Sequence, residues 1–176
     1  MRIMGGLARG IVLKSIIGER LRPATGYLRE AIFSVLGKSV EGSYFLDLFA
    51  GTGSYGLEAL SRGARQGIFV EYDSRCLAIL KENLINVCKN IEMPTNCYLW
   101  NMDALKVKTK ERFDIIFIDP PYDYAREKKR ELLTFGANLL RESGQSRLIF
   151  VIPQDIIFEM GTDLYCLDIR MLRRRG

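Results

Sequence analysis

The feature that most constrains the fold is a regular alternation of short apolar segments with helical segments from residue 44 onward. Five apolar segments are predicted to be strands, namely residues 44–49, 67–71, 97–100, 113–118 and 147–152. Apolar residues at helical spacing predict helices near residues 55–62, 74–87 and 126–140. Near-continuous apolar strands separated by helices are typical of a parallel sheet covered on both faces. The sequence therefore predicts a doubly wound, Rossmann-like α/β fold with a mostly parallel central sheet.

The first 40 residues differ in charge from the rest of the chain. They carry seven basic and two acidic side chains, which accounts for the whole net charge of +5. Short apolar pieces between glycines predict a hairpin or arm, followed by a helix over residues 28–36. We expect a small basic N-terminal extension over residues 1–40 and a Rossmann-like core over residues 41–176. A basic arm suits phosphate backbones, but a basic surface is as often a device for solubility, so charge alone leaves nucleic-acid binding open.

The composition limits the chemistry that the chain can perform. The 176 residues include no histidine, and the four cysteines form no C-x-x-C pair, so we expect reduced thiols and no metal site. Without histidine, proton transfer near neutral pH must use carboxylates, backbone carbonyls or a cofactor that is already reactive. No apolar run approaches the roughly 18 residues of a membrane span, and the N-terminus lacks the apolar stretch of a signal peptide, which predicts a cytoplasmic protein.

A glycine-rich segment lies where the first predicted strand of the core ends and a helix begins. Gly51, Gly53 and Gly56 satisfy the G-x-G-x-x-G pattern, which permits a tight turn and a close approach of backbone to a nucleoside-bearing cofactor. The glycines alone fit a dinucleotide as well as S-adenosylmethionine. Asp47 favours the second, because a carboxylate would repel a pyrophosphate, whereas S-adenosylmethionine carries an ammonium, a sulfonium and no phosphate. A nucleotide-dependent oxidoreductase is the alternative.

Further candidate cofactor contacts follow the second and third predicted strands of the core. Glu71 can accept hydrogen bonds from ribose hydroxyls. Asp103 can accept from an adenine amino group, with Tyr72 and Met102 as apolar walls. Each acid has a structural alternative, because Glu71 could be a surface acid and Asp103 a helix cap. Asp73, or the serine after it, is expected to cap the next helix.

The tetrapeptide Asp119-Pro120-Pro121-Tyr122 follows the fourth predicted strand. Two adjacent prolines stiffen a turn and lack N–H groups, so the Pro120 carbonyl and the Asp119 carboxylate can face outward as a fixed pair of acceptors. Such a pair suits both hydrogens of an exocyclic amine on a nucleobase, and Tyr122 offers a flat ring on which an extruded base can stack. The alternative is a rigid turn in which Asp119 is only a capping acid.

Longer runs of the chain match a single family. They comprise residues 47–53, 56–64, 71–73 and 119–122, together with Arg2-Ile3, a Gly6-x-x-Arg9-Gly10 turn, Leu21-Arg22-Pro23 and residues 29–33. This pattern resembles the RsmD-type guanine-N2 methyltransferases of bacterial small-subunit ribosomal RNA. The Asp-Pro-Pro-Tyr tetrapeptide is shared with DNA and RNA amino-methyltransferases generally, whereas the run at residues 57–64 and the basic N-terminal pattern are more specific.

The resemblance implies a Rossmann-like methyltransferase that transfers a methyl group from S-adenosylmethionine to N2 of a guanine in small-subunit (16S) ribosomal RNA. It implies that the cofactor is bound by Asp47, Gly51, Gly53, Glu71 and Asp103. It also implies that the target guanine is handled by Asp119 and Tyr122 beside Pro121, and that Arg22, Thr25 and Arg29 grip RNA or fold over the cofactor. The expected partner is ribosomal RNA or an assembling 30S subunit, and the expected state is a monomer.

The chain differs from the family pattern at two places. Gly26-Tyr27 stands where the family commonly has an Asp-Arg pair, and residues 164–170 are predicted as a strand that leaves the last antiparallel strand of such enzymes missing. A DNA adenine or cytosine amino-methyltransferase is an alternative, although the chain leaves little room for a target-recognition region. A non-catalytic RNA-binding assembly factor is another, and intact Asp47, Glu71 and Asp119 argue against it.

Overall fold

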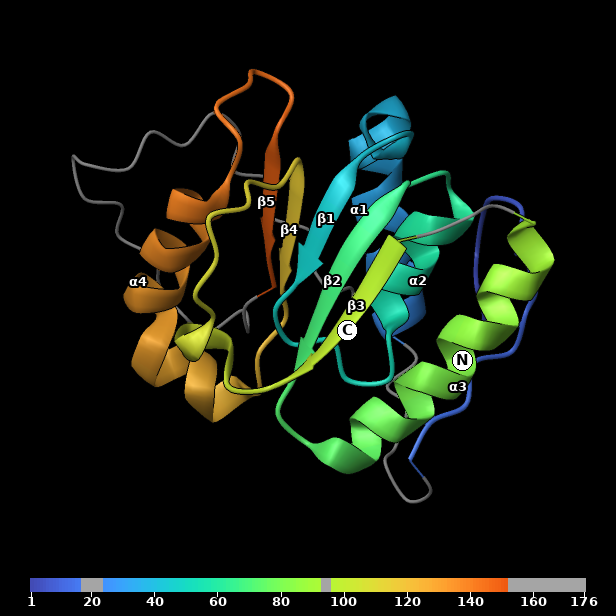
Figure 1. Ribbon diagram of the computed structural model, residues 1–176, viewed down its shortest axis with the longest axis horizontal. Coiled ribbons are helices and arrows are strands. Elements are labelled where there is room, and N and C mark those ends of the chain that lie inside the picture. Colours follow the sequence, from blue (N-terminus) through green and yellow to red (C-terminus); the bar gives the residue numbers. More distant parts are fainter. Residues whose placement is uncertain (17–23, 93–95, 152–176) are drawn as a thin grey trace.

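The centre of the molecule is a five-stranded parallel sheet with the strand order β3-β2-β1-β4-β5 (Figure 1). The structure is a computed structural model that describes residues 1–16, 24–92 and 96–151. The strands are β1 Tyr44–Asp47, β2 Gln66–Glu71, β3 Asn96–Asn101, β4 Ile115–Ile118 and β5 Arg147–Phe150. The helices are α1 Ala24–Leu36, η1 Gly37–Val40, α2 Ser54–Ser61, α3 Ser74–Ile91, η2 Ala104–Lys106 and α4 Tyr122–Leu139. The predicted Rossmann-like α/β fold is confirmed.

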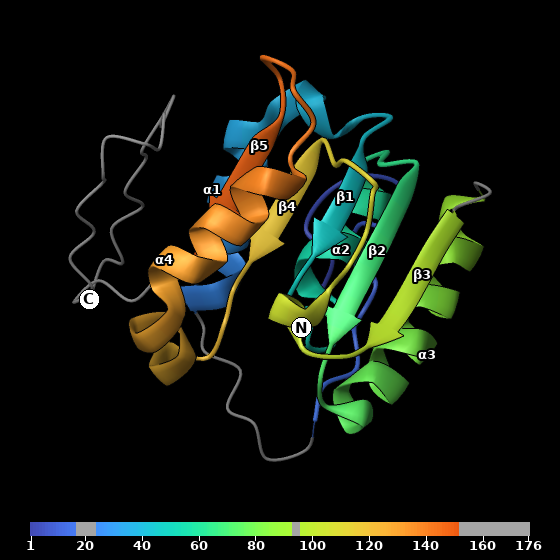
Figure 2. The same cartoon turned by 60° about the vertical axis from the view of Figure 1, so that its left-hand side comes forward.

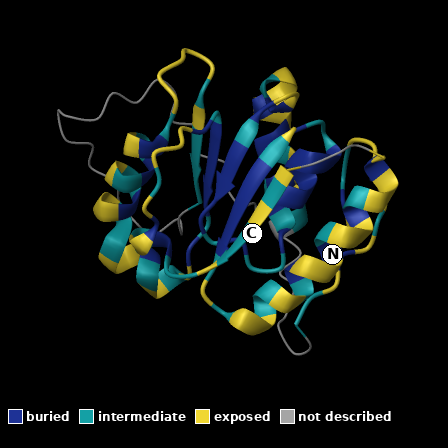
Figure 3. Cartoon of the chain, viewed as in Figure 1, coloured by how far each residue is buried: buried dark blue, intermediate teal, exposed yellow. Residues whose placement is uncertain are grey.

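Helices cover the sheet on both faces, with α1, α2 and α3 on one side and α4 on the other (Figure 2). The side chains of a strand point alternately to its two faces, so Phe45 of β1 packs toward α2 while Leu46 packs toward α4. Phe69 and Phe117 join Phe45 on the first face, where their rings meet edge to face. The central strands are accordingly buried along their length (Figure 3). Each fully buried phenylalanine contributes about 1.5–3 kcal/mol to stability.

The N-terminal segment folds back on itself and joins this core. Arg2 and Val12 form an antiparallel bridge, and the side chains of Ile3, Ala8 and Leu13 are buried in the same apolar cluster as α1 and α2. The segment therefore packs as part of the sheet's first face. A boundary between an extension and a core near residue 40 stays a prediction.

The helices differ from their predicted ranges mainly at the ends. α4 begins at Tyr122 instead of residue 126, directly after Pro121 at its N-cap. The last residue of the Asp-Pro-Pro-Tyr tetrapeptide thus belongs to a helix. α3 continues to Ile91, beyond the predicted end at residue 87.

Two expectations from the sequence concern parts of the chain beyond this description. Arg22 and the predicted strand at residues 164–170 lie outside the described residues. Within the described part of the chain, no helix combines the length and the apolar character that a membrane crossing requires.

Candidate active site

Three carboxylates gather at the carboxyl edge of the sheet. Asp47 ends β1, Glu71 ends β2 and Asp119 follows β4, and β1 pairs with both neighbouring strands. The charges of Asp119 and Glu71 both act on Asp47, which shows that the three groups share one environment. Parallel sheets bind ligands at this edge, beside the strand where the order reverses. The arrangement provides a local excess of negative charge that suits a cation.

Asp47 is the most deeply buried of the three. It is 0% exposed, and its Oδ2 accepts a hydrogen bond from the backbone N–H of Gly56 at 3.1 Å. Its Oδ1 has no hydrogen-bond partner among the described residues. Burial raises the pKa of Asp47 to about 7, and the charges of Asp119 and Glu71 add to the effect, against the N–H of Gly56, which lowers it. A buried carboxylate oxygen without a donor is the group that a bound ammonium or sulfonium would satisfy.

The loop between β1 and α2 leaves room for a ligand on one side and packs closely on the other. Gly51 and Gly53 have positive φ angles of 54° and 97°, which favour glycine. A Cβ at Gly51 would meet no described atom within 4 Å. A Cβ at Gly56 would lie 2.2 Å from Cε1 of Phe69, so the third glycine allows α2 to approach the sheet. The loop thus presents backbone to open space at Gly51 while its end is fixed by packing.

Glu71 holds this loop in place. Its Oε2 accepts the backbone N–H of Gly51 at 2.7 Å, and its Oε1 accepts that of Asp73 at 2.7 Å. Asp73 caps α3, with its side chain accepting the N–H of Arg75, as the sequence predicted. Each carboxylate oxygen of Glu71 keeps a further lone pair for a ligand hydroxyl.

An open depression adjoins Glu71 at the ends of β2 and β3. It has a volume of about 470 Å³ and is lined by Tyr72, Asp73, Ser74, Asn101 and Met102. Tyr72 and Met102 therefore line one space, and the Tyr72 side chain is largely exposed. Asn101, which sequence reasoning missed, donates to the backbone carbonyls of Glu71 and Tyr72 at 2.8 and 2.9 Å and so joins the end of β3 to the end of β2 beside the depression. The sequence could have indicated Asn101, because it is a polar residue at the end of an apolar strand.

Asp103 lies beside this depression and performs a structural task as well. Its Oδ1 accepts the backbone N–H of Leu105 at 2.9 Å and caps η2. The hydroxyl of Tyr124 lies 3.5 Å from the same oxygen. The alternative of a helix cap is thus confirmed, and a contact of Asp103 with adenine stays a prediction.

The Asp-Pro-Pro-Tyr tetrapeptide links β4 to α4 at the same edge. Asp119 and Tyr122 are partly exposed, Pro120 is buried and Pro121 is exposed at the N-cap of α4. The carbonyl of Pro121 accepts the N–H of Ala125 at 2.9 Å, which anchors the first turn of the helix. The turn is therefore held rigidly at both ends, by β4 and by α4.

Two polar residues near the glycine loop carry no motif, and sequence reasoning missed them. Tyr55 lies in the first turn of α2, is 5% exposed, and its ring stacks on Phe117 with centroids 5.5 Å apart. Burial, and after it the charge of Asp119, raises the pKa of its hydroxyl. Asn83 of α3 is buried and donates to the carbonyls of Thr52 and Lys14 at 2.9 and 3.0 Å. Asn83 thereby ties the N-terminal segment to the glycine loop.

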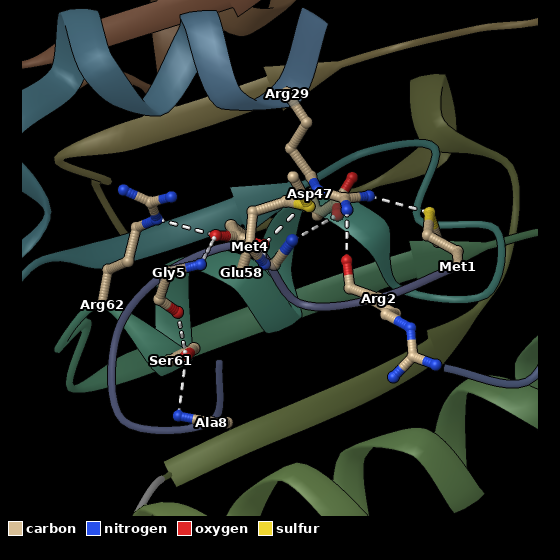
Figure 4. A network of polar contacts seen from close by, with 11 residues as sticks. Met1, Arg2, Met4, Gly5, Ala8, Arg29, Asp47, Glu58, Ser61 and Arg62 are labelled. Atoms are coloured by element: carbon tan, nitrogen blue, oxygen red, sulfur yellow. Dashed lines mark hydrogen bonds and ion pairs between the residues drawn. The ribbon is translucent and has the colours of Figure 1, made fainter. Parts of the chain in front are cut away.

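The structure corrects the substrate-binding role predicted for Arg29. This side chain is 1% exposed and lies between α1 and α2, with Nε 3.4 Å from Oε2 of Glu58 and Nη2 donating to the carbonyl of Arg2 at 2.5 Å (Figure 4). Burial lowers its pKa, and the charge of Glu58 opposes that effect. A guanidinium enclosed in this way does not reach RNA. The position of Arg29 in a basic segment gave no sign that its partner lies on α2.

Glu58 is the centre of a network that fastens the N-terminal segment to α2 (Figure 4). It accepts the backbone N–H groups of Met4 and Gly5 at 2.9 and 2.8 Å, and Nε of Arg62 at 2.8 Å. Ser61, on the same helix, donates to the carbonyl of Gly5 and accepts the N–H of Ala8. We call these contacts, with Arg29, the clamp network.

The remaining predicted residues are described only in part. Thr25 lies in α1, and its side chain is not described. Across residues 1–16, 24–92 and 96–151, no group of three or more Cys, Asp or Glu side chains is arranged to hold a metal ion.

Comparison with known proteins places the chain among methyltransferases. The family model described as conserved hypothetical protein 95 matches residues 1–147. A Haemophilus influenzae protein named Ribosomal RNA small subunit methyltransferase D is 37% identical over 70% of this chain and 65% of that protein. The Escherichia coli K12 protein of the same name is 34% identical over 82% of this chain and 68% of that protein. Among solved structures, hypothetical protein TTHA0928 of Thermus thermophilus has a TM-score of 0.71 at 30% identity, covering 92% and 91% of the two chains.

Proposed function

Since the chain belongs to the conserved hypothetical protein 95 family of RsmD-type methyltransferases, we propose that it transfers a methyl group from S-adenosylmethionine to N2 of a guanine in small-subunit ribosomal RNA. The observation that carries the proposal is the acidic edge of the sheet, where the buried Asp47 has an oxygen without a described partner. A cationic cofactor would satisfy that oxygen. The two relatives are named as methyltransferases of small-subunit ribosomal RNA, and the chain spans about two thirds of their length.

The residues at the edge fit S-adenosylmethionine better than a dinucleotide. Asp47 and Glu71 create a negative field that attracts a sulfonium and an ammonium and repels a pyrophosphate. The open side of Gly51 admits a ligand against the backbone, and Glu71 can accept ribose hydroxyls. The depression beside Tyr72 and Met102 offers apolar walls to adenine. Bound there, the cofactor would supply an electrophilic methyl group.

The Asp-Pro-Pro-Tyr turn would hold the target base. The carboxylate of Asp119 and the carbonyl of Pro120 accept the two hydrogens of the guanine amino group, and Tyr122 stacks on the ring. Fixing the amine in this way orients its lone pair toward the methyl carbon. After transfer, the nitrogen must lose one proton, and Asp119 is the anionic group that can accept it. The chemistry needs no histidine, which agrees with the composition.

The partner, the cellular location and the assembly state belong to the same proposal. The basic residues of the N-terminal 40 other than the enclosed Arg29 would meet the phosphates of ribosomal RNA or of an assembling 30S subunit. A cytoplasmic monomer would suffice for this activity.

The direct test is methyl transfer from labelled S-adenosylmethionine to unmodified small subunits, to naked ribosomal RNA and to DNA, followed by nucleoside analysis. We expect label in N2-methylguanosine from the ribosomal substrates. Label in N6-methyladenine or N4-methylcytosine from DNA would identify a DNA amino-methyltransferase instead. Binding to RNA without any transfer would identify an assembly factor.

Asp119→Asn separates the two halves of the site. We expect a loss of kcat of about 10²–10³-fold, because the variant loses an anionic acceptor at the amine. Affinity for S-adenosylmethionine, measured by calorimetry, should be largely unchanged. Asp123→Asn is the matched control, since Asp123 is an exposed acid in the first turn of α4 and should keep full activity. A loss of cofactor affinity equal to the loss of rate would contradict the division of roles.

A further inference from the structure

A second open depression lies on the α4 face of the sheet. It has a volume of about 580 Å³. Its lining includes Lys108, Lys110 and Arg112 from the chain before β4, and Phe135, Asn138 and Leu139 from the last turns of α4. The three basic side chains are exposed, whereas Leu139 is buried and Phe135 partly so. No carboxylate is among the described residues that line this depression, so it combines apolar surface with positive charge.

The basic side chains of the depression belong to residues 106–112, which we call the lysine segment. Figure 1 shows the segment running beside α4 from η2 to the start of β4. It carries four basic side chains and one acid, a net charge of +3, although the chain beyond residue 40 is neutral by count. Lys106 and Lys108 are exposed, and Val107 between them is buried. The packing of Val107 thus turns its basic neighbours outward.

The cations of the depression have no acidic partners among the described residues. No ion pair there involves Lys108, Lys110 or Arg112, and Glu111, the one acid of the lysine segment, does not line the depression. Arg112 donates from Nη1 to two backbone carbonyls, at 3.3 and 3.0 Å, which leaves its charge uncompensated. Ion pairs at 2.6–2.9 Å do engage other basic side chains, namely Lys14, Arg62, Arg75, Lys128 and Arg141. Cations without counter-charges keep a positive potential that attracts a polyanion.

The depression lies at the far end of α4 from the Asp-Pro-Pro-Tyr turn. α4 begins with Tyr122 of that turn and spans 18 residues, which corresponds to about 27 Å. Its last residue, Leu139, accepts the backbone N–H of Phe113 at 3.0 Å, just before β4 begins. The lysine segment covers the distance between the two edges of the sheet, because it starts directly after η2 at the carboxyl edge. A single nucleotide at the turn would not reach the depression, but a longer polynucleotide would.

We propose that the lysine segment and the last turns of α4 form a binding surface for the sugar-phosphate backbone of the RNA substrate, with Lys108, Lys110 and Arg112 contacting phosphates. The inference rests on the proposed function, because an RNA substrate supplies these phosphates. Such contacts orient a nucleic acid without reading its sequence. The N-terminal segment lies on the opposite face of the sheet, so the RNA is held on both sides of the carboxyl edge. This favours a large folded RNA over a short fragment.

Lys108→Gln combined with Lys110→Gln tests the surface, because it removes two charges from exposed positions and leaves the fold intact. We expect the affinity for unmodified small-subunit ribosomal RNA, measured by filter binding at low salt without cofactor, to fall about tenfold. The slope of log affinity against log salt concentration should become shallower by about 1.5. Affinity for S-adenosylmethionine and kcat at saturating RNA should be unchanged. An unchanged affinity and salt slope for RNA would overturn the proposal.

Lys81→Gln combined with Lys89→Gln is the matched control. It removes the same charge from two exposed lysines of α3, on the other face of the sheet. The affinity for RNA and the salt slope should stay close to those of the unaltered protein. Equal losses in the two double variants would show that only net charge matters, which would also overturn the proposal.

Duplex DNA at the same phosphate concentration is the second probe. Tighter binding of DNA than of RNA, lost in the Lys108 and Lys110 double variant, would assign the surface to DNA and overturn the proposal. If the unaltered protein transfers no methyl group while the double variant loses affinity for RNA, the proposed function fails and the RNA-binding surface stands. If methyl transfer is present and the double variant binds RNA normally, the surface fails and the proposed function stands.

Discussion

At the scale of single residues, the buried carboxyl of Asp47 lowers the stability of the cofactor-free protein. Its pKa is about 7 in the folded chain, against an ordinary 3.8. Between these values the folded state holds a proton that the unfolded state has released, so the free energy of unfolding falls as pH rises through this window. Above the folded pKa the full cost of the buried charge is present. This cost is on the order of 4 kcal/mol.

Asp47→Asn should remove most of this pH dependence. The amide keeps an oxygen for the N–H of Gly56 but carries no charge. The free energy of unfolding of the unaltered protein should fall between pH of about 5 and about 8, and this fall should be smaller in the variant by on the order of 3 kcal/mol. Urea unfolding of both proteins without cofactor at the two pH values measures the difference. The other carboxylates contribute equally to both proteins and cancel in the comparison. Parallel pH profiles would contradict a buried, titrating Asp47. Affinity for S-adenosylmethionine should fall in the same variant.

The site residues that end or directly follow a strand were predictable from sequence, because the sheet fixes where they lie. Asp47, Glu71 and Asp119 follow apolar strands, so their shared edge could be expected from parallel topology. The burial of Tyr55 and Arg29 could not be predicted, because nothing in the neighbouring sequence indicates it, and the role first assigned to Arg29 was therefore wrong. A basic residue in a basic segment is expected to be exposed, and only packing shows that Arg29 is enclosed.

At the scale of elements, α2 joins the active edge to the N-terminal segment. Its first turn carries Tyr55, and its later turns carry Glu58 and Ser61 of the clamp network. Glu58 is fully buried and meets two guanidinium groups, from Arg29 and Arg62. A buried ion pair becomes costly when one partner is removed, because the other charge is left without compensation.

Glu58→Gln should therefore destabilise the fold by about 3–5 kcal/mol in urea unfolding. The substitution keeps the shape of the side chain and leaves the buried Arg29 without an anion. Glu82→Gln is the control, because Glu82 pairs with Lys14 on the surface, with its side chain 57% exposed. A surface pair of this kind contributes about 0–1 kcal/mol. Equal losses in the two variants would show that the clamp network does not stabilise the molecule.

At the scale of the whole molecule, the fold was predictable because one pattern repeats along the chain. Five apolar strands alternating with helices leave few arrangements other than a parallel sheet, and each of these five strands is present. The attachment of the first 16 residues was harder to foresee. Their bonds to α2 run from backbone N–H groups to Glu58 and Ser61, and backbone groups leave no trace in sequence.

The buried carboxyl of β1 also makes cofactor binding a proton-exchange reaction. With a pKa of about 7, Asp47 carries about half a proton near neutral pH in the free protein. A cation placed beside it favours the carboxylate, so each binding event releases part of a proton to the buffer. The heat of S-adenosylmethionine binding near neutral pH should then differ between phosphate and Tris, and the contribution of Asp47 to that difference should be absent in Asp47→Asn. Equal heats in the two buffers would exclude this exchange. A chain without histidine would in this way respond to changes of pH near neutrality through one buried carboxyl.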